Sequence, residues 1–156
     1  MKMKNMKMKN MKMKNKKMKK NKFALISLTL TSFFLGPWAL ANEAILKGLE
    51  KEARSADAKF VQFNITAGEK FFRSERINSS GEKVSCMTCH SPDPKKTGMT
   101  RANKVIEPMA PAVNAERFTD MVKVQKWFKR NCNDVLDRAC TAQEKGNFVK
   151  YMMSIK

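Results

Sequence analysis

The segment Ser85-Cys86-Met87-Thr88-Cys89-His90 decides what this 156-residue chain folds around. It contains Cys-x-x-Cys-His, the attachment pattern of c-type haem. Two thiols three positions apart on one helical turn can both reach the vinyl groups along one haem edge, and the next residue places an imidazole beneath the iron. His90 is the only histidine of the chain, so no second imidazole competes for that position. The segment therefore predicts one haem c, bonded to Cys86 and Cys89, with His90 as an iron ligand.

Two other kinds of site also use paired cysteines. A thioredoxin-like redox pair requires a βαβ setting, and no strand-rich pattern surrounds this segment. A structural zinc site would need Cys132 and Cys140 as further ligands, but their separation of eight residues fits the short ligand spacing of such sites poorly. Chance is the third alternative for a five-residue pattern. The export signal described next argues against it, because haem is attached to such proteins outside the cytoplasm.

The first 41 residues have the organisation of a secretory signal peptide. Met1–Lys22 holds 11 lysines and no acidic residue, and the apolar run Phe23–Leu35 follows. Gly36-Pro37 interrupts the run, and Ala39-Leu40-Ala41 offers the small residues that a signal peptidase recognises. An uncleaved membrane anchor is the alternative, but the run is shorter than the roughly 20 apolar residues of a spanning helix. We therefore expect cleavage after Ala41 and a periplasmic mature protein.

The lysine-rich N-terminus also accounts for most of the net charge of +18. Met-Lys-Met-Lys-Asn occurs three times in tandem from Met1 to Asn15, as in an expanded coding repeat, and Met18 would begin a signal peptide of ordinary length. Without Met1–Lys22 the chain has 21 basic and 14 acidic residues, a net charge of +7. That is an ordinary basic surface, so we expect no nucleic-acid partner.

Most of the mature chain is expected to be helical with long irregular loops, because strand-like alternation is almost absent. The N-terminal segment, 42–65, contains one short expected helix, Ala44–Ala53. The haem domain is expected to span 66–156 and to begin with a helix that Thr66 caps, with Glu69 as its capping-box partner.

The C-terminal part predicts two further helices. One runs from about Thr119 to Asn131, and the other begins at a capping box formed by Thr141 and Glu144. The last helix carries apolar residues at helical spacing, which are expected to be ordinary core: Phe148, Val149, Met152 and Ile155. Gly68 would let another helix cross closely. An N-terminal helix that crosses a C-terminal helix beside the Cys-x-x-Cys-His turn resembles the class I cytochrome c fold, so we expect a small all-α fold of that kind.

The stretch Ser91–Val113 is expected to be an irregular loop that covers a haem edge, because an ordered loop of this length usually wraps a ligand. It contains all the prolines that follow the haem segment. Arg101 and Lys104 lie in this loop and are candidates to pair with the haem propionates. Solvated surface charge is the alternative for both.

The second axial ligand of the iron separates electron carriers from gas-binding proteins. The usual choice is a loop methionine, for which Met109 in Glu107-Pro-Met-Ala-Pro111 is the candidate. Asn131 is the competing candidate, because it continues the apolar stripe of its helix and follows Trp127 by four residues. An asparagine at such a position is also a common helix C-cap. The residues alone leave all three interpretations open.

The residue pattern resembles the family of sphaeroides haem protein, a group of class I-like monohaem cytochromes. The resemblance runs from about Thr66 to the C-terminus and is densest from Ser85 to Lys145. It rests on these groups: Arg117-Phe-Thr-Asp120, Lys126-Trp127, Arg130-Asn-Cys-Asn133, Cys140-Thr141 and Glu144-Lys145. That family has an asparagine as distal ligand, followed at once by a disulfide cysteine. The resemblance implies Asn131 as the second iron ligand and a Cys132–Cys140 disulfide, which also suits an oxidising compartment. Free structural thiols are the alternative to the disulfide.

The resemblance also implies a function. The family's asparagine leaves the iron on reduction, and the ferrous iron can then bind oxygen, nitric oxide or carbon monoxide. Electrons come from a dihaem c-type cytochrome and, behind it, a membrane b-type cytochrome. We therefore expect an exported cytochrome that accepts electrons and binds a diatomic gas. A plain electron carrier with Met109 as ligand is the alternative, and steady turnover of oxygen or a nitrogen oxide would mark a true enzyme.

Overall fold

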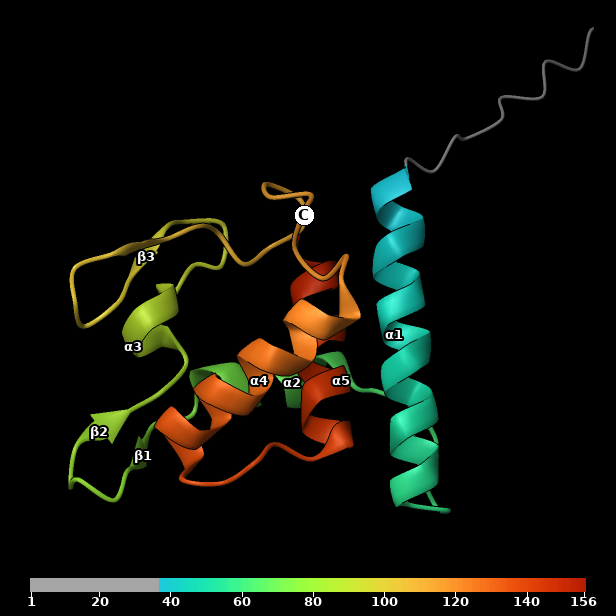
Figure 1. Cartoon of the computed structure of the whole chain (residues 1–156), viewed down its shortest axis with the longest axis horizontal. Helices are drawn as coiled ribbons and strands as arrows, with labels where there is room; N and C mark the ends of the chain where they lie inside the picture. The colour runs from blue at the N-terminus through green and yellow to red at the C-terminus, as the bar shows by residue number, and fades with distance from the viewer. Residues whose placement is uncertain (1–36) are drawn as a thin grey trace, which may run out of the picture. The chain divides into compact units, whose positions relative to one another are not determined.

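The computed structural model describes residues 37–156, so most of the predicted signal peptide lies outside the described residues. Within this range the chain forms five helices and four short strands (Figure 1). The helices are α1 (Pro37–Ala56), α2 (Ile65–Arg73), α3 (Met87–His90), α4 (Met121–Leu136) and α5 (Ala142–Ser154). No helix in the described range has the length and apolar character that crossing a membrane requires. The predicted all-α class is confirmed.

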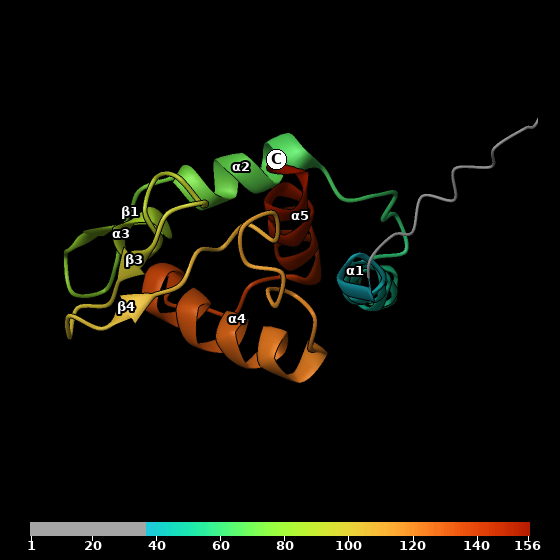
Figure 2. The same cartoon turned by 90° about the horizontal axis from the view of Figure 1, so that it is seen from above.

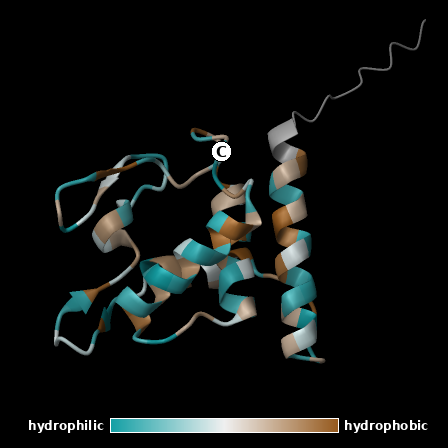
Figure 3. Ribbon diagram, in the orientation of Figure 1, coloured by the Kyte–Doolittle hydropathy of each residue, from teal (hydrophilic) through white to brown (hydrophobic). Residues whose placement is uncertain are grey.

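Helix α1 begins at Pro37, and a residue type without a backbone N–H suits a first helical turn, where that group would have no partner within the helix. Ile45, Leu49 and Ala53 recur every four residues and are buried in the core, and α1 packs on α5. Figure 3 shows apolar and polar residues alternating along this helix. The predicted helix Ala44–Ala53 is therefore confirmed, with extensions at both ends.

Helix α2 begins earlier than the sequence pattern indicated. Asn64 is its N-cap, in an extended conformation, and its side-chain oxygen accepts from the Ala67 N–H at 2.8 Å. The predicted cap at Thr66 is wrong, because Asn64 supplies a better-placed acceptor before the first turn. The predicted capping-box partner, Glu69, instead pairs with Arg73 at 2.9 Å.

Helices α2 and α5 pack closely against each other, and Figure 2 shows them adjacent from a second direction. A Cβ at Gly68 would overlap the backbone of Asn147 and the side chain of Tyr151, so the predicted close crossing at this glycine is confirmed. The Phe72 ring on α2 is fully buried, with its centroid 6.0 Å from that of Phe148 on α5. This crossing forms the centre of the hydrophobic core.

Helix α4 is longer than predicted. The Asp120 side chain caps it by accepting from the backbone N–H groups of Val122 at 2.9 Å and Lys123 at 3.1 Å. The expected end at Asn131 is wrong, because the helix continues to Leu136 and Asp137 ends it with a left-handed φ of 54°. No glycine or proline lies between Asn131 and that point to stop the helix earlier.

Helix α5 starts as the sequence predicts. The Thr141 hydroxyl accepts from the Glu144 N–H at 3.1 Å, and the Glu144 carboxylate accepts from the Thr141 N–H at 2.8 Å, which completes the capping box. The apolar residues predicted as core are buried (Phe148, Val149 and Met152) or packed against it (Ile155).

Two small antiparallel ladders flank α3 in the sequence. Strand β1 (Arg76–Ile77) pairs with β2 (Lys83–Val84), and β3 (Gly98–Met99) pairs with β4 (Val105–Ile106). The turn between β1 and β2 is attached to the end of α4, because the N–H and hydroxyl of Ser79 donate to Asp137 at 2.8 and 2.7 Å. The second ladder gives the predicted irregular stretch after His90 its local order.

Candidate haem site

Cys86, Cys89 and His90 lie together on one helical turn. The His90 N–H donates to the Cys86 carbonyl at 3.0 Å, and the Ser85 N–H donates to the Thr88 hydroxyl at 2.9 Å. Both thiols are free and partly exposed. The expected arrangement, with two thiols and an imidazole on a single turn, is present.

The state of the cysteines separates the alternative uses of this segment. Burial raises the pKa of the Cys86 thiol to about 11, whereas a redox-active thiol needs a lowered pKa. Cys132 and Cys140 form a disulfide, which removes both of them as zinc ligands. The strand pairs of the described residues are both antiparallel, so neither belongs to a βαβ unit. These observations favour haem attachment over a redox pair or a zinc site.

The His90 imidazole is in the state that a metal ligand requires. Burial lowers the pKa of His90 to about 4, and the positive charge of Arg117 adds to the effect. The ring is therefore neutral at physiological pH, as an iron ligand must be. Its Nδ1 atom is buried and has no hydrogen-bond partner among residues 37–156.

The chain after His90 folds back against the haem segment. Ser91 has a positive φ of 66° and turns the backbone away from α3. Gly98 in β3 then lies so close to the Cys89 carbonyl that a Cβ would overlap it. The Pro94 carbonyl accepts from the N–H groups of Met109 at 2.8 Å and Ala110 at 3.0 Å. The loop that was expected to lie beside the haem is thus ordered around the attachment turn.

These residues fit a covalent haem c. Cys86 and Cys89 would hold it through two thioether bonds, and His90 would ligate its iron. Such a group would supply a redox-active iron, and the identity of its other protein ligand would decide whether a gas can bind.

Asn131 lies half-buried in the interior of α4, next to the buried Cys132. The helix continues past it to Leu136, so the interpretation of Asn131 as a C-cap is wrong. Trp127, one turn earlier, is 48% exposed, and the Arg130 guanidinium lies 5.2 Å from the centroid of its ring. A polar or metal partner would stabilise an amide at the edge of an apolar stripe, because burial of an unpaired amide is costly.

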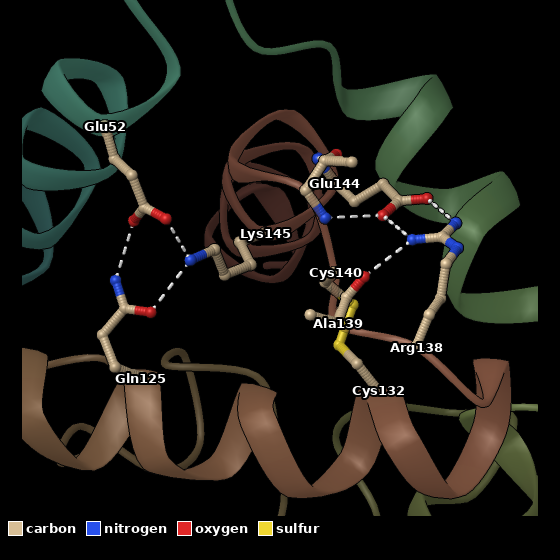
Figure 4. Close-up of a disulfide and its surroundings, with 9 residues drawn as sticks. Glu52, Gln125, Cys132, Arg138, Ala139, Cys140, Glu144 and Lys145 are labelled. Atoms are coloured by element: carbon tan, nitrogen blue, oxygen red, sulfur yellow. Dashed lines mark hydrogen bonds and ion pairs between the residues drawn. A yellow bond between two sulfur atoms is a disulfide. The ribbon is translucent and has the colours of Figure 1, made fainter. Parts of the chain in front are cut away.

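The disulfide joins α4 to the start of α5. Cys132 and Cys140 have Cα atoms 5.6 Å apart, and Thr141, which caps α5, follows directly. Figure 4 shows the bridge beside the ion pair of Arg138 and Glu144, whose atoms are 2.7 Å apart. The bond implied by the resemblance is present, and it anchors the residue that follows Asn131.

Met109 is buried in the hydrophobic core, with 7% of its surface exposed. Arg117 holds the preceding chain, because its side chain donates to the carbonyls of Pro108 at 2.8 Å and Glu107 at 2.6 Å. The loop that carries Met109 is therefore fixed on both sides, by these bonds and by those to Pro94.

Arg117 is a site residue whose role the sequence pattern does not indicate. Its guanidinium is partly buried, which lowers the pKa of Arg117, and its charge acts on His90. Arg101, a predicted propionate partner, pairs with Glu82 at 2.7 Å, and Lys104 is exposed. Arg117 belongs to the Arg-Phe-Thr-Asp group of the resemblance, but its burial could not be read from spacing.

Comparison with known sequences identifies related proteins. The family model described as "Domain of unknown function (DUF1924)" matches residues 58–152. The cytochrome c-type protein SHP of Cereibacter sphaeroides is 36% identical over 130 residues, which cover 80% of this chain and 95% of that protein. Cytochrome c'' of Methylophilus methylotrophus is 38% identical over 103 residues, which cover 65% of this chain and 72% of that protein.

Comparison with solved structures agrees with the sequence matches. The crystal structure of oxidised cytochrome c'' from Methylophilus methylotrophus superposes with a TM-score of 0.68 at 34% identity, covering 75% of this chain and 96% of that one. Its solution structure, described in terms of haem-ligand detachment, gives 0.66 at 34% identity and covers 74% and 94%. Oxidised SHP, described as an oxygen-binding cytochrome c, gives 0.63 at 33% identity and covers 71% and 94%.

Proposed function

Because this chain belongs to the family of c-type cytochromes that includes sphaeroides haem protein and cytochrome c'', we propose that it binds a diatomic gas at ferrous iron after Asn131 is released. The protein is an electron-accepting monohaem cytochrome, and oxygen and nitric oxide are the proposed physiological ligands. The observation that carries the proposal is the place of Asn131: half-buried, inside α4, and next to the disulfide.

The chemistry of an amide supports a releasable ligand. A neutral amide oxygen or nitrogen binds ferric iron weakly and competes poorly for ferrous iron, so reduction favours its departure. Once free, the Asn131 side chain has N–H groups that can donate a hydrogen bond to a bound diatomic molecule. His90 would remain bound, because it shares one helical turn with the two attachment cysteines.

The relatives support both halves of this proposal. The solved structure of SHP is described as that of an oxygen-binding cytochrome c, and the solution structure of cytochrome c'' is described in terms of haem-ligand detachment. We carry these properties to the present chain because it has the attachment turn, the disulfide and an asparagine directly before the first disulfide cysteine.

Export and electron delivery complete the proposal. The lysine-rich N-terminus, the apolar run and the small residues before Asn42 support transfer to the periplasm, with cleavage after Ala41. A dihaem c-type cytochrome, supplied in turn by a membrane b-type cytochrome, is the proposed electron donor. The net charge of +7 that remains without Met1–Lys22 would attract an acidic donor.

The alternative is an electron carrier in which Met109 ligates the iron. Its buried position is compatible with a ligand as well as with core packing, so Met109 provides the comparison variant. In that case the ferrous haem would be low-spin and would not react with carbon monoxide.

The experiment is an optical spectrum of the purified haem protein, ferric and ferrous, with and without carbon monoxide, for wild type, Asn131→Ala and Met109→Leu. We expect a high-spin ferrous form that binds carbon monoxide at once, and a ferric spectrum that changes in Asn131→Ala only. A low-spin ferrous form that is inert to carbon monoxide in wild type and opened by Met109→Leu would replace this proposal with the electron carrier.

A further inference from the structure

Three polar side chains connect α1, α4 and α5. The ammonium group of Lys145 on α5 bonds to the Glu52 carboxylate on α1 and to the side-chain oxygen of Gln125 on α4, the latter at 2.9 Å. The Gln125 amide closes the arrangement by donating to Glu52 at 2.9 Å. Figure 4 shows these side chains pointing toward one another, beside the disulfide. We refer to Glu52, Gln125 and Lys145 as the polar network.

The three side chains depend on one another because Lys145, which bonds to both of the others, is buried. The Lys145 side chain is 9% exposed, and a buried ammonium group is tolerated only when it is paired and hydrogen-bonded. Glu52 supplies the opposite charge, and Gln125 supplies a second acceptor while donating to Glu52. The three positions therefore hold α1, α4 and α5 in one relative arrangement.

Helix α4 depends on such side-chain links. Helices α1 and α2 pack closely on α5, whereas α4 makes few close backbone contacts with the other helices. Its attachments to the rest of the fold include Phe128, whose ring centroid lies 5.5 Å from that of Phe148, the Cys132–Cys140 disulfide, and Gln125 in the polar network. Val124 is also buried in the core, and Ser79 bonds to Asp137 at the end of the helix.

Helical geometry shows what two of these links do together. Gln125 and Cys132 are seven residues apart, almost two turns, so they lie on the same side of α4 and about 10 Å apart along its axis. Asn131 directly precedes Cys132, so its side chain points about 100° away from that side. Two attachments on one side would resist rotation of the helix about its axis, and they would thereby help to keep the direction of the Asn131 side chain.

We propose that the polar network positions Asn131: together with the disulfide, it limits rotation of α4 about its axis and keeps the Asn131 amide in place as a ligand for the haem iron. Glu52, Gln125 and Lys145 are positioning residues, because they act through α4. The inference rests on the proposed role of Asn131. It also assigns a function to α1, which precedes the residues matched by the family model.

Two variants break the network in different ways. Gln125→Met removes the link to α4 and leaves the Lys145–Glu52 ion pair, so no buried charge is left alone. Lys145→Met removes the ammonium group that bonds to both Glu52 and Gln125. Gln143→Met is the matched control, because Gln143 is also half-buried and bonds to Asn147 at 2.8 Å and to the Gln62 carbonyl at 3.3 Å.

The readouts are cyanide binding to the ferric haem protein, which must displace Asn131, and carbon monoxide binding to the ferrous protein, from which Asn131 has already gone. We expect cyanide binding to become about tenfold faster in both network variants, because each variant removes hydrogen bonds that together hold the three helices. Carbon monoxide binding should stay at the wild-type rate in both network variants, and Gln143→Met should match wild type in both reactions.

Asn131→Ala, measured in parallel, separates two kinds of failure. If Asn131→Ala accelerates cyanide binding and the network variants do not, the positioning role is refuted and the proposed function stands. Equal acceleration of cyanide and carbon monoxide binding in the network variants would also refute it, because a general loosening of the fold would act on both. If Asn131→Ala itself binds cyanide at the wild-type rate, the proposed function fails and the positioning role fails with it.

Discussion

The two sides of the haem site are held in different ways. On the proximal side, Cys86, Cys89 and His90 share one turn, and the chain folds back onto that turn at Gly98. On the proposed distal side, Asn131 lies on a helix whose supports come from distant parts of the chain: Glu52 bonds to Gln125 across 73 positions in the sequence. Neighbouring residues in the sequence hold the proximal side together, whereas contacts between distant segments hold the distal side.

This difference suits the two proposed ligands. A proximal histidine held beside two covalent thioether bonds needs little help from the rest of the protein. A distal amide forms a weak bond, so its occupancy depends on how accurately the surrounding helix presents it. The distal side is therefore where substitutions far from the haem should change ligand exchange, and the proximal side is where local substitutions should affect attachment.

The largest expected effect distinguishes the two cysteine pairs. Cys86→Ser together with Cys89→Ser should abolish covalent haem, because no thiol remains to form a thioether bond. Cys132→Ala together with Cys140→Ala should retain covalent haem, because Cys132 and Cys140 form a disulfide with each other and take no part in haem attachment. Haem staining of the denatured, exported proteins after electrophoresis measures both. Covalent haem on the first variant, or its loss from the second, would break the assignment of the two pairs.

The next effect tests the close packing on the proximal side. Gly98→Ala should lower the free energy of unfolding by about 2 kcal/mol, because its Cβ would overlap the Cys89 backbone, and overpacking typically costs 1–3 kcal/mol. Denaturant unfolding of the haem protein measures it. Gly48→Ala is the control, since its Cβ would meet only the mobile end of the Met121 side chain. Equal losses at the two glycines would contradict the proposed tight contact.

The distal disulfide should contribute a comparable amount by a different route. Cys132→Ala together with Cys140→Ala should lower the free energy of unfolding by about 2.5 kcal/mol, because the bridge restricts the unfolded chain over a short loop. It should also accelerate cyanide binding to the ferric protein, since α4 loses its covalent link to the start of α5. A stability loss without faster cyanide binding would show that the disulfide stabilises the fold without positioning Asn131.

The contrast between the two sides also explains what the sequence could predict. The attachment turn follows from residues that are neighbours in the chain, and the capping box of α5 follows from Thr141 and Glu144 three positions apart. The close crossing at Gly68 was likewise visible as a glycine within an amphipathic helix. Such patterns involve residues close in the sequence, so they predict local structure regardless of how the rest of the chain folds.

The structure of the distal side could not be predicted from local patterns in the sequence. The spacing of Asn131 allowed a ligand or a helix C-cap, and only the observed continuation of α4 to Leu136 excludes the cap. The partners of Gln125 and the burial of Arg117 depend on which segments the fold brings together. The cap of α2 was misplaced because Asn64 and Thr66 are both good cap residues, and a tertiary contact, the Asn147 side chain bonding to the Asn64 N–H at 2.8 Å, accompanies the observed choice.

The smallest expected effect concerns the charge at the start of α5, next to the disulfide. The hydrogen bond from Arg138 holds the pKa of Glu144 below its usual 4.5, and the Thr141 N–H acts in the same direction. The folded state therefore favours the ionised carboxylate, so its contribution to stability is complete above pH 4.5 and is lost as the pH falls through the lowered value. Glu144→Gln keeps an acceptor for the Thr141 N–H but removes the charge opposite Arg138. Thermal unfolding should show wild type slightly more stable than Glu144→Gln at neutral pH, with the difference shrinking in acid. A difference that stays constant with pH would mean that Glu144 stabilises the start of α5 through packing and not through its charge.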